Sequence, residues 1–225
     1  MVDYLASNPG VARVMTEGSA GVDGVRARRG TRRVVRQATA ATGRPAVFLD
    51  RDGVLTEAFV RDGVPTPPRT QAEFRVLPGV AEACSGLRQA GFVLVVVTNQ
   101  PDIARGTQDR AEVDKMNERL RSLVPLDEVC VCPHDDADDC ACRKPRPGML
   151  LDAADRLGLD LARSVSVGDR WRDIQAALRA GVTPIHLDRH YDERPPAGAR
   201  AVVADLPEAA VWILEQKRAP EGDVR

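Results

Sequence analysis

Two carboxylates, those of Asp50 and Asp52, directly follow an apolar stretch in the segment VFLDRDGVLT. Residues i and i+2 of an extended chain project to the same side, so both side chains face one site at the end of a predicted strand. Carboxylates this close require a cation, or one of them must hold a proton. The pair suits phosphoryl transfer, in which an ionised carboxylate attacks phosphorus and a protonated one donates to the leaving oxygen. The alternative is a loop of solvated acidic residues.

Polar residues also end two later apolar runs. The run FVLVVV is followed by Thr98, Asn99 and Gln100, which can present hydrogen-bond donors to phosphate oxygens. The run SVSVG is followed by Asp169, with Asp173 four residues later near the start of a predicted helix. Because Mg²⁺ prefers one or two carboxylates with water and substrate oxygens, Asp169 can join the first carboxylate pair in holding this ion. Taken alone, each of these strand ends is ordinary.

Lys144 lies between these two runs and is one of 3 lysines in a chain with 29 arginines. Where arginine is used so heavily, a lysine indicates a position that needs a compact, point-like cation. Its ammonium group suits the neutralisation of a carboxylate nucleophile and of a phosphoryl group. The alternative is a solvated surface lysine.

The segment CPHDDADDCAC carries four metal-binding side chains in the spacing C-x-H-x5-C-x-C: Cys132, His134, Cys140 and Cys142. Three thiolates and one imidazole complete a tetrahedral Zn²⁺ shell without an open position, so we expect a structural zinc. The metal would fix the polar loop that delivers Arg143 and Lys144. Disulfides are one alternative, but the odd number of 5 cysteines argues against a disulfide framework. A zinc-finger DNA reader is another, but no helix follows at the appropriate place.

The chain has 225 residues, of which 43% are hydrophobic and 29% charged, and its formal charge is -1. This composition suits one globular domain, and the balanced charge argues against nucleic acid or an anionic membrane as a partner of the whole protein. No stretch approaches the roughly 18–20 apolar residues of a membrane-spanning helix. The N-terminus lacks the features of a secretory signal. We therefore expect a cytoplasmic protein.

The N-terminal part of the chain is basic, with 8 arginines and 3 acidic residues in residues 1–45. We expect residues 1–44 to be a disordered extension, residues 45–217 to form the catalytic domain and residues 218–225 to be a flexible tail. The alternative for the extension is a nucleic-acid arm or a targeting segment, centred on the run RARRGTRRVVR at 26–36.

Short apolar runs alternate with amphipathic stretches from residue 46 onward, which indicates strand–helix units around a parallel sheet. The expected strands are 46–49, 92–97, 129–132, 164–167 and 184–187, and the expected helices are 79–90, 109–124, 147–157, 171–180 and 206–217. Because the runs are continuously apolar, both faces of the sheet should be covered. The prediction is a doubly wound, Rossmann-like α/β sandwich of three layers. Residues 56–76 indicate a loop or small hairpin beside the site, too short for a lid domain.

The order of the DxD, Thr-Asn, Lys and GDxxxD motifs resembles that of the haloacid dehalogenase superfamily of aspartate-nucleophile phosphotransferases, over about residues 46–190. The resemblance implies that fold with a minimal cap. It implies these roles: Asp50 as nucleophile, Asp52 as general acid and base, Thr98 and Lys144 as phosphoryl-binding groups, and Asp173 as the group that orients Lys144 or a metal-bound water. It also implies an Mg²⁺ ion held by the Asp50 side chain, the Asp52 carbonyl oxygen and Asp169.

Within this superfamily the chain resembles two zinc-bearing groups, the heptose 1,7-bisphosphate 7-phosphatases and the histidinol-phosphate phosphatases. The segments TNQPDIARG and RKPRPGML are similar to motifs of the first group, whereas the short zinc loop is similar to that of the second. The first resemblance covers more residues. It implies an Mg²⁺-dependent phosphatase that acts, as a monomer, on a small phosphorylated metabolite. The expected substrate contacts are Arg51, Asn99, Gln100, Arg143 and Arg170.

Three positions depart from the heptose group: Pro101 stands where serine is usual, Arg170 where lysine is usual and Thr56 where asparagine is usual. These departures leave the exact sugar and its anomer open. Arg61 and Arg69 in the loop after the first strand suit a second phosphate, with solvated loop arginines as the alternative. A hypothesis from another class is a zinc-stabilised nucleic-acid-binding protein that acts on terminal phosphates through the 26–36 arm.

Overall fold

Six parallel strands form the central sheet in the computed structural model, which describes residues 43–61 and 63–218. The strand order is β5-β4-β1-β6-β7-β8. The strands are β1 (Ala46–Leu49), β4 (Val93–Asn99), β5 (Glu128–Cys132), β6 (Val165–Gly168), β7 (Thr183–Leu187) and β8 (Ala201–Val203). This doubly wound parallel sheet confirms the predicted fold class. Because β1 lies between β4 and β6, the residues that follow these three strands meet at one edge of the sheet.

Strand β1 explains why its sequence is apolar at every position. Val47 and Leu49 belong to one buried cluster, whereas Ala46 and Phe48 belong to a second cluster on the opposite face. All four side chains are completely buried, because helices cover both faces of the sheet.

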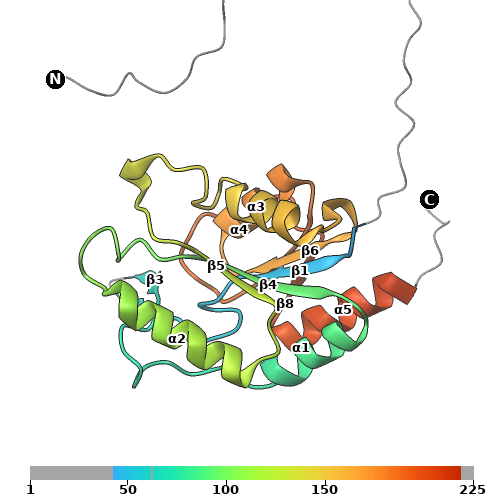
Figure 1. The fold of residues 1–225 in the computed structure, drawn as a ribbon, viewed down its shortest axis with the longest axis horizontal. Coiled ribbons are helices and arrows are strands. Elements are labelled where there is room, and N and C mark those ends of the chain that lie inside the picture. Colours follow the sequence, from blue (N-terminus) through green and yellow to red (C-terminus); the bar gives the residue numbers. More distant parts are fainter. Residues whose placement is uncertain (1–42, 62, 219–225) are drawn as a thin grey trace, which may run out of the picture. The chain divides into compact units, whose positions relative to one another are not determined.

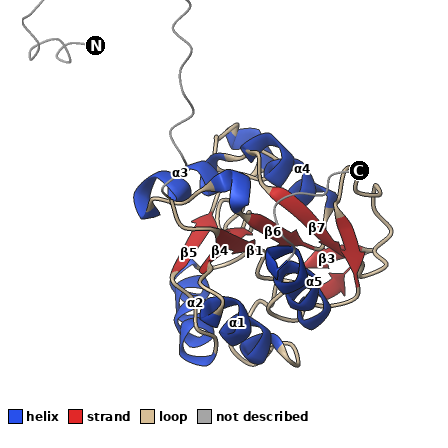
Figure 2. Cartoon of the chain, turned by 90° about the vertical axis from the view of Figure 1, so that its right-hand side faces the viewer, coloured by secondary structure: helices blue, strands red, loops and turns tan. Residues whose placement is uncertain are grey.

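Five helices form the two outer layers in the described part of the chain. Helices α1 (Val80–Gln89), α2 (Arg110–Leu123) and α5 (Leu206–Arg218) pack on one face, and helices α3 (Gly148–Leu157) and α4 (Trp171–Ala180) pack on the other (Figures 1 and 2). Each predicted helix is found within one residue of its expected bounds. Short 3-10 helices at Asp136–Asp138 and Leu161–Arg163 complete the helical segments.

Two short elements lie outside the main alternation of strands and helices. The segment 56–76 contains an antiparallel hairpin, β2 (Phe59–Arg61) and β3 (Val64–Thr66), which is the small-hairpin form of the prediction. Strand β8 was not predicted, because it has only three residues at the edge of the sheet and Val202 in its middle is exposed. Its apolar residues, AVV, form a run too short to distinguish from the apolar residues of an ordinary loop.

The described domain begins slightly earlier than predicted. Arg44 pairs with Leu159 through a backbone bridge, one residue before the expected start of the domain at residue 45. The rest of the predicted extension, the 26–36 arm and residues 219–225 lie outside the described residues. Within the described part, none of the helices combines the length and apolarity that crossing a membrane requires.

Truncation of Phe48 tests the role of β1 in the core. Phe48 is 0% exposed, and its side chain belongs to the buried cluster between the sheet and the layer formed by α3 and α4. Phe48→Ala should lower the free energy of unfolding by about 3–5 kcal/mol, because the substitution loses buried area and leaves a cavity. Val211→Ala, at an exposed position of α5, should change it by less than about 0.5 kcal/mol. Urea denaturation measures both, and equal effects would contradict this packing.

Candidate active site

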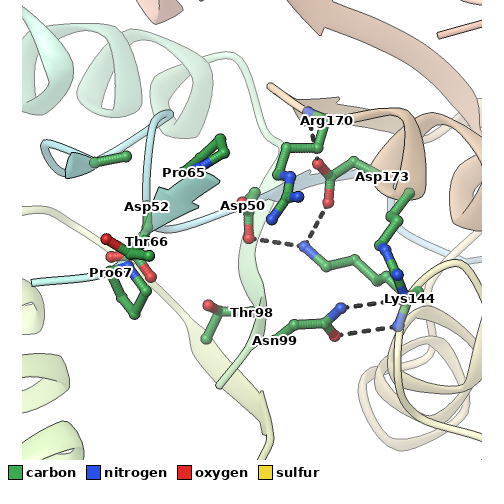
Figure 3. A pocket seen from close by; sticks show the side chains of 12 residues that line it. Asp50, Asp52, Pro65, Thr66, Pro67, Thr98, Asn99, Lys144, Arg170 and Asp173 are labelled. Atoms are coloured by element: carbon green, nitrogen blue, oxygen red, sulfur yellow. Dashed lines mark hydrogen bonds and ion pairs between the residues drawn. The ribbon is translucent and has the colours of Figure 1, made fainter. Parts of the chain in front are cut away.

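Side chains from three neighbouring strand ends line one pocket at the carboxyl edge of the sheet (Figure 3). Asp50 follows β1, and Thr98 and Asn99 end β4. The rest of the lining comes from the loop after β1, from the hairpin and the residue after it, from the loop after β5 and from the start of α4: Asp52, Ala58, Pro65, Thr66, Pro67, Lys144, Arg170, Arg172 and Asp173. The sequence motifs thus meet at one place, although Asp173 follows Asp50 by 123 positions in the sequence.

The Lys144 ammonium group joins two carboxylates at the floor of this pocket. Its Nζ atom lies 2.7 Å from Asp50 Oδ1 and 2.6 Å from Asp173 Oδ1, and it donates to the Val97 carbonyl oxygen at 2.7 Å. An ammonium group has three protons, so these partners use all of its donors. Burial disfavours the charged form, but the Asp173 and Asp50 carboxylates outweigh it and raise the pKa of Lys144. The group therefore stays positively charged.

Three buried carboxylates face this single ammonium group. Ligand atoms of Asp50, Asp169 and Asp173 all lie within 4.8 Å of one another. Burial, opposed by Lys144 and reinforced by Asp173, raises the pKa of Asp50 to about 6. Burial and the charges of Asp50 and Asp173 raise the pKa of Asp169 well above its ordinary value. Both Asp169 carboxylate oxygens are buried and form no ion pair among the described residues, and the Tyr191 hydroxyl is the hydrogen-bonding group beside them. This excess of oxygen ligands and negative charge fits a divalent cation such as Mg²⁺.

Gly53 allows the loop after β1 to approach Asp169. Its backbone has a φ of +95°, in the left-handed region that favours glycine, and a Cβ atom at this position would lie 1.8 Å from Asp169 Oδ2. No side chain fits in this space. The glycine of the DRDG segment therefore brings the two acidic strand ends together.

Arg51 is not placed in the pocket, contrary to its expected substrate contact. Its side chain is 0% exposed and forms an ion pair with Asp52 at 2.9 Å. Thr56 and Gln100 also turn to Asp52: Thr56 Oγ1 lies 3.0 Å from Asp52 Oδ1, and Gln100 Nε2 donates to Asp52 Oδ2 at 2.7 Å. Neither side chain lines the pocket. The structure thus gives Arg51, Thr56 and Gln100 contacts to a site carboxylate in place of contacts to substrate.

The other expected substrate contacts have mixed positions. Asn99 lines the pocket, but its amide exchanges hydrogen bonds with the Lys144 main chain at 3.0 and 3.1 Å (Figure 3). Arg170 lines the pocket and pairs with Glu193. Arg143 lies outside the pocket lining, and its guanidinium is bound to Asp136 at 2.7 Å.

Arg172 also lines the pocket, although it was not among the expected site residues. Its guanidinium pairs with Asp136 at 2.9 Å, within the loop that carries the cysteines. Arg172 lies on the first turn of α4, three residues after Asp169, and this position was the one sequence signal for a role at the site. Arg61, by contrast, is bound to Glu73 at 2.9 Å and does not line the pocket.

The four predicted zinc ligands converge at the end of β5. Cys142 Sγ lies 3.3 Å from Cys132 Sγ, 3.4 Å from Cys140 Sγ and 3.3 Å from His134 Nδ1. Cys132 Sγ and Cys140 Sγ are 3.7 Å apart. Zn–S bonds of about 2.3 Å in a tetrahedron place sulfur atoms about 3.8 Å apart, so the cluster has nearly the size of a zinc shell. The donor set therefore fits Zn²⁺.

Gly53→Ala tests the contact between the two acidic strand ends. The new methyl group should displace Asp169 and weaken Mg²⁺ binding at least about tenfold, because a carboxylate ligand is lost. Gly63→Ala is the matched control, since Gly63 also has a left-handed φ, of +77°, but nothing lies within 4 Å of its added Cβ atom. Calorimetric titration with Mg²⁺ measures both affinities. Unchanged binding in Gly53→Ala would show that Asp169 is not a ligand.

Comparisons with known proteins agree with this geometry. Residues 69–181 match the family of haloacid dehalogenase-like hydrolases. The D-glycero-beta-D-manno-heptose-1,7-bisphosphate 7-phosphatase of Bordetella bronchiseptica is 40% identical over 184 residues, which cover 76% of this chain and 98% of that protein. The enzyme of the same name from Escherichia coli K12 is 38% identical over 185 residues, which cover 73% of this chain and 93% of that protein.

A solved structure shares the fold as well as the sequence. The D,D-heptose 1,7-bisphosphate phosphatase from B. bronchiseptica, complexed with magnesium and phosphate, has a TM-score of 0.66 and 36% identity, and the match covers 76% of this chain and 99% of that chain. With its sheet, its Asp50–Lys144 pair and relatives matched over nearly their whole length, the protein belongs to the haloacid dehalogenase-like hydrolases, as its motif order predicted.

Proposed function

We propose that the protein is a phosphatase that removes the 7-phosphate of D-glycero-D-manno-heptose 1,7-bisphosphate, with the β anomer as its substrate. The observation that carries the proposal is the Asp50 carboxylate held 2.7 Å from the Lys144 ammonium at the floor of the pocket. Relatives that are 34–40% identical and bear this enzyme name, with β in it, support the choice of substrate.

The side chains of the pocket suit two successive transfers. An Asp50 oxygen attacks phosphorus, the bond from phosphorus to the sugar oxygen breaks, and Asp52 gives its proton to that oxygen. Asp52 then takes a proton from water, which attacks the aspartyl phosphate, releases inorganic phosphate and restores Asp50. Lys144 and Thr98 stabilise the negative charge on the phosphoryl oxygens during both transfers.

Mg²⁺ fits the acidic end of the pocket. Asp50, Asp169 and the Asp52 carbonyl oxygen would hold the ion, and the two buried oxygens of Asp169 support this assignment. The bound cation would neutralise charge on the phosphoryl oxygens. The solved B. bronchiseptica relative is described with magnesium and phosphate.

The guanidinium groups at the pocket favour a substrate with a second phosphate. Arg170 and Arg172 both line the pocket on the first turn of α4. Guanidinium groups bind phosphate oxygens through paired hydrogen bonds. Arg143 is 2.7 Å from Asp136, which also binds Arg172, so Arg172 and the loop that carries the cysteines belong to one charged network, whereas Arg170 pairs with Glu193.

Zn²⁺ in the Cys132, His134, Cys140 and Cys142 cluster would fix the loop that delivers Lys144. The loop between β5 and α3 carries mostly polar residues and has few apolar side chains to order it by burial. Its position matters because Asn99 holds the Lys144 main chain directly after the last cysteine pair. A structural zinc therefore supports the active site without touching substrate.

Removal of two cysteines tests the zinc site. The double variant Cys140→Ala, Cys142→Ala should lose the bound zinc, because only two ligands remain. Cys130→Ala is the control, since Cys130 lies on β5 outside the four-residue cluster and should leave the zinc content unchanged. Elemental analysis of the purified proteins measures zinc per chain. Full zinc occupancy in the double variant would contradict the assignment.

Asp50→Asn tests the catalytic proposal. The amide cannot attack phosphorus, so phosphate release should fall by at least about a thousandfold while the fold is kept. Asp114→Asn, at an exposed position of α2, should retain full activity. Phosphate release with Mg²⁺ is measured from both anomers of the heptose bisphosphate and from histidinol phosphate.

The substrate panel separates the candidates. Preference for the β-heptose bisphosphate supports the proposal, whereas preference for histidinol phosphate would overturn it in favour of the function indicated by the short zinc loop. Normal turnover in Asp50→Asn would contradict the assigned nucleophile. A cytoplasmic location and a monomeric state remain predictions, as does the passive role of the N-terminal extension.

A further inference from the structure

The buried guanidinium of Arg51 neither attacks phosphorus nor transfers a proton in the proposed phosphatase reaction. Arg51 is among the largest completely buried side chains in the described part of the chain. A buried charge is costly unless it is paired and hydrogen-bonded. Its contacts therefore identify what this arginine supports.

Arg51 and two neighbours fix both oxygens of the Asp52 carboxylate. Arg51 Nε donates to Asp52 Oδ1 at 3.0 Å, and Arg51 Nη2 donates to Asp52 Oδ2 at 2.9 Å. Thr56 Oγ1 lies 3.0 Å from Oδ1, and Gln100 Nε2 lies 2.7 Å from Oδ2. Each oxygen is thus held by the planar fork of one arginine and by a second side chain. Thr56 Oγ1 also lies 3.2 Å from the Arg51 carbonyl oxygen, so Thr56 can donate there and leave room for a proton on Asp52. The fork sets the orientation of the carboxylate plane.

Asn117 in turn holds Arg51. Arg51 Nη1 donates to Asn117 Oδ1 at 2.8 Å, across 66 residues of sequence. Asn117 is 6% exposed and lies on the apolar face of α2 with Val113, Met116 and Leu120. A polar residue is otherwise unfavourable on such a face, because burial of an amide requires a hydrogen-bond partner. Its amide oxygen therefore has a specific partner, the guanidinium that binds Asp52.

We propose that Arg51 and Asn117 are positioning residues that aim the Asp52 carboxyl group at the oxygen of the leaving group. Helix α2 thereby contributes to proton donation without touching the substrate. The inference rests on the proposed phosphatase function and deepens it. A proton donor must lie within about 2.6–3.2 Å of the oxygen that it protonates. Loss of the Asn117 acceptor frees one edge of the arginine fork and lets the carboxyl group turn away.

The leaving group distinguishes this role from a structural one. A sugar or alkyl oxygen leaves poorly without a proton, whereas p-nitrophenolate leaves well as an anion. Misplacement of Asp52 therefore slows the cleavage of alkyl phosphates more than that of aryl phosphates. The ratio kcat/KM reports the steps up to leaving-group departure, so later hydrolysis of the aspartyl phosphate does not obscure the comparison.

The experiment compares two near-isosteric variants in the full chain. Asn117→Leu keeps the branched shape and removes the acceptor, and Asn117→Asp keeps both. For Asn117→Leu we expect kcat/KM to fall about tenfold or more with the heptose bisphosphate and with simple alkyl phosphates, but less than about twofold with p-nitrophenyl phosphate. The slope of log kcat/KM against leaving-group pKa should become steeper. Asn117→Asp should stay within about twofold of the wild type on every ester.

Val113→Ala is the matched control for damage to α2. Val113 is completely buried one turn before Asn117 and its side chain has no hydrogen-bonding group, so its truncation should lower thermal stability and leave the slope unchanged. If Asn117→Leu does not fold, Asn117→Ala removes the same acceptor and is measured in the same way. Equal losses on all esters, or the same steepening in Val113→Ala, would overturn the inference.

The same assays separate this inference from the proposed function. If the wild type cleaves simple monoesters but not the heptose bisphosphate, the proposed substrate is refuted. The slope measured on the simple monoesters then decides whether Arg51 and Asn117 are positioning residues. Wild-type inactivity on every phosphate monoester would refute the phosphatase proposal and the inference with it.

Discussion

Three buried carboxylates share one buried ammonium group, and the surrounding structure follows from this arrangement. Asp50, Asp169 and Asp173 converge within 4.8 Å, and Lys144 neutralises only one of their charges. Such a cluster is stable only when further positive charge or protons enter it. A divalent cation would supply the missing positive charge, and Asp50, Asp169 and the Asp52 carbonyl oxygen would hold it. The electrostatics thus favour phosphoryl transfer before any particular substrate is considered.

The fold brings these charges together by simple means. Strand β1 lies between β4 and β6, so residues that follow three strands meet at one edge without long excursions of the chain. Lys144 comes from a loop, and two contacts secure it: the Asn99 amide holds its main chain, and the cysteine cluster ends two residues before it. The loop that carries the cysteines and the end of β4 therefore both position the same lysine.

Much of this organisation could be predicted from the sequence, because apolar runs and acidic strand ends depend on local order along the chain. The helices and the convergence of Asp50, Asp169 and Lys144 followed from that pattern. Arg51 was expected to contact substrate, but its side chain is buried, and the sequence already contained the reason. The alternation that places Asp50 and Asp52 on one side of the chain turns the intervening residue to the other. Asn117 could not be identified, because its partner Arg51 is 66 residues away in sequence, whereas Arg172 had only its position on the first turn of α4 as a signal.

The central claim is that the Lys144-bound carboxylate of Asp50 is the nucleophile. The most direct measurement mixes the enzyme with substrate and Mg²⁺, stops the reaction with acid within milliseconds and locates the covalent phosphate by mass spectrometry of the peptides. The account predicts an acyl phosphate on Asp50. An acyl phosphate on Asp52, Asp169 or Asp173 would contradict it.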